Sequence, residues 1–251
     1  MKRILYSLFC GVFALSASIS AIAQSSADID AEELIRRIET QYWGESSHSV
    51  MRMTIVTDVW SRELKMESWS IGRDRFLARI LEPRKEAGTA TLRIEDDMWN
   101  YLPKIDRLMK IPSSLMGDSW MGSHLTNDDL VKENKIDQLY TFDVKASGDS
   151  TAVITCTPKP DAAIVWGKLV YHADIEKMIP RNIEYYDEDG ELVRTILFDN
   201  VKKISGHWVP LQMVVQPKDK PDERTELNYD ELEFGVDIGN DFFSLRTLRS
   251  R

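Results

Sequence analysis

An alternation of apolar and polar residues runs through most of this chain, and it constrains the fold more than any other feature. Met51, Met53 and Ile55 lie on one side of the first run, and the residues between them are polar. Further short runs of this kind cover residues 63–67, 76–80, 90–94 and 98–102. Each run ends at Gly, Pro or a charged residue, so the pattern predicts an antiparallel meander.

The second half of the chain continues the same pattern. The predicted strands cover about 139–147, 151–157, 165–174, 181–187, 191–199, 207–216 and 224–234. Asp189-Gly190 separates two of these runs and indicates a hairpin. Pro210 and Pro217 favour sheet edges, bulges or turns. We therefore expect a mainly β fold with about ten or eleven antiparallel strands in one sheet.

Two segments have a helical rather than an alternating pattern. Asp30 is typical of an N-cap, and apolar residues at helical spacing from Leu34 to Trp43, ending at Gly44, predict a helix over 31–43. Residues 111–134 interrupt the meander with an apolar, Gly- and Ser-broken insert. Within it, Thr126-Asn127-Asp128-Asp129 resembles a capping box and predicts a short helix over about 127–134.

The N-terminus is typical of a secretory signal peptide. Lys2 and Arg3 precede an uncharged stretch to Ile19, and Ala21-Ile22-Ala23 forms a small-x-small cleavage pattern. We expect cleavage after residue 23 and one domain over residues 24–251, located in the periplasm. Cys10 would leave with the peptide, so Cys156 would remain alone and no intramolecular disulfide could form.

Composition excludes several classes of protein. The chain of 251 residues is 43% hydrophobic and 29% charged, which fits neither a disordered chain nor a bundle of membrane helices. Its formal net charge of −9 would become more negative on loss of Lys2 and Arg3. An acidic chain of this kind is a poor ligand for nucleic acid or for an anionic membrane surface.

No motif indicates a bound metal or a cofactor. The four His residues form no metal-binding spacing, although His172 and Asp174 share one face of a predicted strand. The carboxylates of residues 187–189 occupy a hairpin tip, where a solvated turn is a simpler interpretation than weak calcium binding.

Catalytic motifs are also missing from the sequence. Ser123 and His124 lie close to two Asp residues, but no nucleophile elbow surrounds them, and capping or loop hydrogen bonding is the favoured interpretation. Cys156 lies in the middle of a predicted strand and is interpreted as a buried structural residue. We therefore expect a protein that is not an enzyme.

Met and Trp residues are concentrated between Trp43 and Leu125. Each of them singly is best explained as a core residue. Taken together, they indicate a surface that accepts varied apolar ligands, because Met side chains are flexible and polarisable. A curled sheet of about ten strands encloses more space than its own side chains fill, so an apolar cavity under the insert is expected.

Several segments resemble the outer-membrane lipoprotein-sorting family, the LolA-like group. They are residues 69–77 (WSIGRDRFL), 88–92 (GTATL), 99–104 (WNYLPK), 119–124 (SWMGSH), 126–130 (TNDDL) and 243–246 (FSLR). The resemblance covers essentially all of residues 24–251. It implies an unclosed antiparallel barrel with helices over its concave face.

The resemblance also implies a function and partners. It implies a periplasmic carrier of the acyl chains of lipoproteins or other lipids, with transient membrane contact and a role in outer-membrane biogenesis. It implies a donor in the inner membrane, a transporter of the ABC or RND type. No nucleic-acid partner is expected, and the chain is expected to be a monomer.

Residues 111–130 are predicted to form a lid over the cavity, with hinge freedom at Gly117 and Gly122. The predicted lipid-binding residues, in the wall and in the lid, are Met53, Ile55, Met66, Phe76, Ile80, Leu92, Trp99, Tyr101, Leu115, Met116, Trp120 and Met121. Six basic residues form a further candidate group: Arg73, Arg75, Arg79, Lys104, Arg107 and Lys110. They could bind a lipid phosphate or an acidic partner surface, although paired surface charges are the simpler interpretation.

Two alternatives remain open. One is a periplasmic sensor or accessory subunit that uses the same fold to bind a protein, in which case the barrel would be filled. The other is a lipid hydrolase that uses His124, which no motif supports. A continuous apolar cavity distinguishes a carrier from a sensor.

Overall fold

A computed structural model describes residues 30–132, 135–148 and 150–250 of the chain. The predicted signal peptide, residues 1–23, lies outside the described residues. Among the described residues, no helix combines the length and the apolarity that crossing a membrane requires.

The β-strands dominate the described residues. They are β1 (Ser46–Val56), β2 (Ser61–Ile71), β3 (Arg75–Glu82), β4 (Ala90–Ile94), β5 (Asp97–Leu102), β6 (Arg107–Lys110), β7 (Tyr140–Gly148), β8 (Thr151–Pro158), β9 (Lys168–Asp174), β10 (Ile179–Tyr186), β11 (Leu192–Ile204), β12 (His207–Pro217) and β13 (Arg224–Phe234).

Helices occur near both ends of the described residues, between β5 and β6, and between β6 and β7. The α-helices are α1 (Ala31–Trp43), α2 (Asn127–Lys132), α3 (Ile136–Leu139) and α4 (Leu245–Arg249). The 3-10 turns are η1 (Pro103–Ile105), η2 (Ser113–Leu115), η3 (Trp120–Gly122) and η5 (Asn240–Phe242).

All of these strands form one antiparallel sheet. The strand order is β6-β5-β4-β3-β2-β1-β13-β12-β11-β10-β9-β8-β7. Strands that follow one another in sequence therefore pair, except β6 and β7, and β1 joins β13. Because β6 and β7 stand at the two ends of this order, the sheet is unclosed. The predicted mainly β, LolA-like fold is confirmed.

The predicted number of ten or eleven strands was wrong, because the sheet has 13 strands. The edge strand β6 was missed, since its four residues, Arg107–Lys110, are too short to show a period. The hairpin at Asp189-Gly190 is confirmed, with the Gly190 N–H donating to the Asp187 carbonyl across the turn between β10 and β11.

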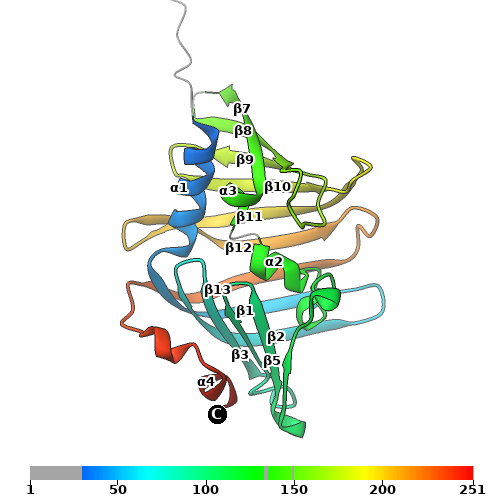
Figure 1. The fold of residues 1–251 in the computed structure, drawn as a ribbon, viewed down its shortest axis with the longest axis vertical. Coiled ribbons are helices and arrows are strands. Elements are labelled where there is room, and N and C mark those ends of the chain that lie inside the picture. Colours follow the sequence, from blue (N-terminus) through cyan, green and yellow to red (C-terminus); the bar gives the residue numbers. More distant parts are fainter. Residues whose placement is uncertain (1–29, 133–134, 149, 251) are drawn as a thin grey trace, which may run out of the picture.

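The helix predicted over 31–43 is confirmed with its boundaries. Asp30 caps it, since its carboxylate accepts the backbone N–H groups of Glu32 and Glu33. Leu34, Ile35 and Ile38 form the buried face. Figure 1 shows α1, α2 and α3 lying over the same face of the curved sheet, which we call the concave face.

Most of the core lies between this concave face and the helices. Residues of β1 to β3 face it in alternation, as in Met53, Met66 and Ile80, and the far strands contribute residues such as Ile154 and Tyr185. Cys156 belongs to the same core and is fully buried, as predicted.

A second, smaller core lies on the other face of β3, β4 and β5. Leu77, Leu92 and Tyr101 pack there against Phe243 and Leu248, which come from the C-terminal segment around α4. In β3 the neighbours Leu77 and Ala78 are both fully buried although they point to opposite faces. This end of the sheet is therefore covered on both sides.

The insert folds as predicted from its capping signal. The Asp129 N–H donates to the Thr126 hydroxyl (3.1 Å), and the Thr126 N–H donates to the Asp129 carboxylate (2.7 Å). This reciprocal capping box begins α2. Helix α2 is described as far as Lys132, and its predicted end at 134 lies outside the described residues; α3 begins at Ile136.

Candidate functional site

A cavity lies on the concave face, under α1 and the insert. The space within it is about 1220 Å³ when its opening to solvent is included. Its lining residues come from α1, the insert and strands on both sides of the β1–β13 pair: Ile38, Glu39, Ser47, Ser49, Met51, Ser68, Ser70, Phe76, Trp120, Leu125, Asp129, Leu130, Tyr171, Pro180, Ile183, Phe198, Val209, Met213, Leu227, Tyr229 and Leu232.

One wall of this cavity carries a polar stripe. The β1–β2 register places Ser47 opposite Ser70 and Ser49 opposite Ser68. The hydroxyl oxygens of each pair are 2.7 Å apart, so each pair shares one hydrogen bond. A hydroxyl can accept a second hydrogen bond, so the stripe offers polar contacts within a largely apolar cavity.

Trp120 forms part of the roof of the cavity. Its side chain is 3% exposed, and its indole N–H donates to the Thr91 hydroxyl (3.1 Å). The Thr91 hydroxyl in turn donates to the Asn100 side chain (2.7 Å). A large apolar side chain of the insert is therefore fixed by a polar contact to the sheet below it.

The chain turns sharply after Trp120. Met121 and Gly122 both have a positive φ, at 53° and 74°. Gly adopts this conformation without strain, whereas Met121 is held in it by its surroundings, including an Arg62 guanidinium that donates to the Met121 carbonyl (3.2 Å). Of the two predicted hinge glycines, only Gly122 is left-handed.

A buried ion pair fastens the insert to the far side of the sheet. The two Nη atoms of Arg194, on β11, donate to the Asp129 carboxylate at 2.7 and 2.8 Å. Their side chains are 5% and 2% exposed. The guanidinium also lies 4.2 Å from the ring centre of Tyr185 and 4.6 Å from that of Trp166, which makes cation–π contacts.

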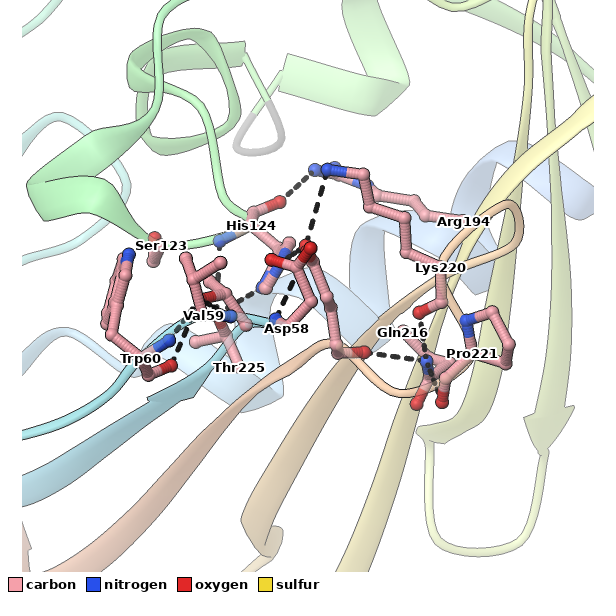
Figure 2. Close-up of polar contacts among 12 residues, drawn as sticks. Asp58, Val59, Trp60, Ser123, His124, Arg194, Gln216, Lys220, Pro221 and Thr225 are labelled. Atoms are coloured by element: carbon pink, nitrogen blue, oxygen red, sulfur yellow. Dashed lines mark hydrogen bonds and ion pairs between the residues drawn. The ribbon is translucent and has the colours of Figure 1, made fainter.

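A second polar network holds the insert at His124 (Figure 2). The Thr225 hydroxyl accepts the His124 backbone N–H (3.0 Å) and lies 2.9 Å from Nδ1. Nε2 lies 3.1 Å from the Glu223 carboxylate, and Arg194 donates to the His124 carbonyl (3.1 Å). Every group is satisfied when Thr225 donates to Nδ1 and the Nε2–H donates to Glu223.

This contact stabilises the charged form of Glu223. The hydrogen bond from His124 is the largest cause that lowers the pKa of the Glu223 carboxyl below its ordinary range, and Lys220, 3.4 Å away, adds to it. As predicted, His124 serves loop hydrogen bonding. Ser123 does the same, because its hydroxyl donates to the Trp120 carbonyl (2.7 Å).

The predicted wall residues are divided between the two faces. Phe76 lines the cavity. Met53, Ile55, Met66 and Ile80 face the same side but belong to the packed core around the cavity. The structure places the three others, Leu92, Trp99 and Tyr101, in the second core on the opposite face.

The predicted lid residues are also divided. Trp120 lines the cavity, and Met116 and Met121 pack against the main core. Leu115 does not line the cavity and is 43% exposed. Sequence reasoning missed the contribution of the second half of the chain, where Ile183, Phe198, Met213 and Leu227 complete the wall. The alternation of these residues within the predicted strands was the sequence signal that could have identified them as wall residues.

The other polar candidates have partners of their own. His172 Nε2 lies 3.4 Å from the Glu184 carboxylate without forming a hydrogen bond, and Asp174 accepts from Arg181 (3.0 Å) and from the Lys177 backbone. Within residues 30–132, 135–148 and 150–250, no group of three or more His, Cys, Asp or Glu side chains is placed to hold a metal ion.

Three members of the predicted basic group also have partners. Arg73 donates to Asp137 (3.0 and 3.1 Å), and Lys110 lies 2.7 Å from Asp97. Arg79 donates to the Thr247 carbonyl beside α4, on the face away from the cavity (2.7 Å). Paired charge is therefore the better interpretation of Arg73 and Lys110, whereas Arg79 binds a backbone carbonyl beside α4.

A family model described as an uncharacterized protein matches residues 72–250. The chain belongs to this family. No curated protein matches it by sequence.

Solved structures place the family in the LolA-like fold. A putative outer-membrane lipoprotein-sorting domain from Vibrio parahaemolyticus is 24% identical, with a TM-score of 0.75 over 87% of this chain and 98% of that one. A DUF1329 family protein from Desulfovibrio piger is 23% identical, with a TM-score of 0.79 over 87% and 97%.

A LolA superfamily protein from Nitrosomonas europaea is 17% identical, with a TM-score of 0.71 over 86% of this chain and 98% of that one. The resemblance to the LolA-like group is thereby confirmed. At these identities the likeness of the solved structures establishes the fold of this LolA-like protein.

Proposed function

We propose that this LolA-like protein is a periplasmic carrier of acyl chains, those of lipoproteins or of other lipids. It binds the chains in the cavity under residues 111–130 and moves them between an inner-membrane transporter and the outer membrane. The observation that carries this proposal is the cavity itself, which is open to solvent and roofed by Trp120.

The physical reason for a carrier is the cost of exposing hydrocarbon to water. Each exposed CH₂ group costs about 0.8 kcal/mol, so an acyl chain does not cross an aqueous compartment unaided. The walls of the cavity, with side chains such as Phe198, Met213 and Leu227, remove this cost. Met is well suited to such a wall, because it repacks around chains of different shape.

Loading and release require the insert to move. Arg194–Asp129 and His124–Glu223 fasten it by polar contacts, in addition to the apolar packing of residues such as Trp120 against the main core. Hydrogen bonds weaken steeply when their geometry changes, so a movement of the insert would break these contacts together. Such contacts suit a roof with a closed and an open position. Gly122 provides the backbone freedom at the turn beside Trp120.

The comparisons support the same compartment and cargo class. One relative in fold is named as an outer-membrane lipoprotein-sorting domain and another as a LolA superfamily protein. The signal-peptide-like start of the chain, two basic residues followed by an uncharged stretch, agrees with export to the periplasm. The cavity favours a carrier over a protein-binding sensor, because a sensor needs no open apolar volume.

Lipid extraction from vesicles tests this proposal. Protein freed of lipid is incubated with phospholipid vesicles, the vesicles are removed, and the lipid that stays in solution with the protein is quantified. Ser68→Phe places a ring in the cavity and is expected to abolish most of this soluble lipid, because Ser68 is 5% exposed and lines the wall.

Lys65→Phe on the same strand is the matched control, because Lys65 points to the other face of β2. It is expected to extract lipid as the wild type does. Absence of protein-bound lipid in the wild type, or equal extraction by the Ser68→Phe variant, would contradict the carrier.

A further inference from the structure

Arg93, near the end of β4, is a buried cation without a partner among the described residues. Its side chain is 1% exposed, and none of its three guanidinium nitrogens makes a hydrogen bond to the described part of the chain. Burial lowers the pKa of its guanidinium to about 10, although Asp74 and Asp96 act in the opposite direction. A buried charge normally has a partner, because its desolvation is otherwise uncompensated.

The nearby carboxylates do not supply that partner. Asp74 and Asp96 are both exposed, and Asp96 accepts a hydrogen bond from Lys135 instead (2.6 Å). Arg194, the other buried Arg on the concave face, makes two charge-assisted hydrogen bonds to Asp129. Arg93 thus keeps five N–H donors available, in a fork that fits a phosphate or carboxylate group.

The sheet register places Arg93 on the concave face, next to the polar end of the cavity and just outside the residues that line it. One row of paired residues crosses five strands on the concave face: Ser47, Ser70, Phe76, Arg93 and Met98. Ser47, Ser70 and Phe76 line the cavity, and Phe76 is the cross-strand neighbour of Arg93. Directly paired side chains are about 4.5–5.5 Å apart at Cβ, so Arg93 stands directly beside Phe76 of the cavity wall.

We propose that Arg93 is the counter-charge for the acidic head group, a phosphate or a carboxylate, of an acyl lipid bound in the cavity. The acyl chains lie against the apolar wall, the serine stripe hydrogen-bonds the ester region, and the guanidinium pairs with the anion. This inference rests on the proposed carrier function and names its cargo class as an anionic lipid rather than an uncharged acylated group.

Calorimetric titration with matched ligands tests the assignment. The probes are a short-chain phosphatidic acid, the diacylglycerol with the same chains, and inorganic phosphate. The wild type is expected to bind the phosphatidic acid at least about tenfold more tightly than the diacylglycerol, because a charge-assisted bidentate pair is about twice as strong as a neutral hydrogen bond.

Arg93→Gln is expected to bring the two dissociation constants to within about twofold while the diacylglycerol still binds, because the apolar wall is unchanged. Arg93→Lys keeps the charge and retains part of the preference. Arg79→Gln is the matched control: it removes an Arg that lies on the next strand but faces α4, and it keeps the wild-type preference.

A stability measurement keeps the test decisive if binding is weak. Removing an unpaired buried charge should raise the unfolding temperature of the lipid-free protein by about 2–4 °C in Arg93→Gln. Phosphatidic acid should raise the unfolding temperature of the wild type more than that of this variant, since it stabilises only the state that binds it.

The outcomes separate the two proposals. Equal affinity of the wild type for both lipids overturns the role of Arg93 and leaves the carrier standing. No binding of either lipid overturns the carrier and this inference together. Inorganic phosphate that binds as tightly as the phosphatidic acid overturns the head-group assignment, because the site would then recognise a free anion.

Discussion

The guanidinium of Arg194 and the carboxylate of Asp129 form a buried, two-bond ion pair between residues that are 65 positions apart in the chain. Arg194 belongs to β11 in the far half of the sheet, and Asp129 begins α2 at the end of the insert. Asp129 also caps its own helix through Thr126. One carboxylate therefore both starts α2 and fixes the insert over the cavity.

Asp129→Asn should destabilise the protein strongly. Removing one partner of a buried ion pair leaves the other charge uncompensated, so we expect the free energy of unfolding to fall by about 3–5 kcal/mol. Asp97→Asn is the control, since the Lys110–Asp97 pair is about half exposed and should contribute less than about 1 kcal/mol. Equal losses in denaturant titrations of the two variants would contradict the role of the buried pair.

Trp120→Asp should weaken lipid retention while the sheet stays folded. The change places a charge in the roof of the cavity and removes the indole N–H that Thr91 accepts. Trp60→Asp is the control, because Trp60 is 42% exposed at the turn between β1 and β2. Lipid retention is measured by co-elution with the protein, and the fold by circular dichroism. Equal lipid retention by Trp120→Asp and the wild type would contradict the assignment of Trp120 to the lid.

The His124–Glu223 contact should make stability depend on pH in acid. The pKa of Glu223 is lowered in the folded state, so the stabilisation is present above the ordinary Glu pKa of about 4.3 and is lost as the pH falls through the lowered value. The wild type should therefore unfold at a higher temperature than Glu223→Gln at pH 7, and the difference should shrink toward pH 3. A difference that is constant over this range would be inconsistent with the charged contact.

The two cores should respond differently to truncation. Leu248→Ala removes a fully buried side chain from the core beneath α4, and we expect it to cost about 2–5 kcal/mol of stability without changing lipid affinity. Met213→Asp alters the cavity wall at a partly exposed position, so it should reduce lipid affinity more than stability. The reverse pattern would mean that the ligand binds at the α4 face.

Cys156 should be inert in the native protein. Burial raises the pKa of its thiol, and the side chain is fully buried in the main core. In a chain that begins at Gln24 it is the sole cysteine, so a thiol reagent reports on it alone. Labelling should proceed only at the rate of unfolding, and guanidinium should restore full reactivity. Rapid labelling without denaturant would show that the main core opens.

Local signals explain what could be predicted from the sequence. Helix α1 was predicted with its boundaries because its cap, apolar stripe and terminal Gly44 lie within 15 residues. The capping box of Thr126 and Asp129 and the turn at Gly190 are equally local. Alternation established the meander, because one face of most strands is core and the other is not.

The features that could not be predicted from the sequence depend on contacts between residues that are distant in the chain. Alternation shows which face of a strand is buried only when the other face is exposed to solvent. Strands β3 to β5 have cores on both faces, so the pattern gave no basis for placing Leu92, Trp99 and Tyr101 at the cavity. The covering segment around Leu248 comes from the far end of the chain. Arg93 was not singled out, because the absence of a partner is visible only in three dimensions.

The most direct test of the carrier is native mass spectrometry of the protein purified from the periplasm, followed by lipid extraction. The account predicts a mass above that of the polypeptide, with the difference released on denaturation as acyl lipid and, according to the assignment of Arg93, as anionic lipid. A polypeptide mass alone, with no uptake of added lipid or acylated peptide, would contradict the account and favour a protein-binding role for this fold.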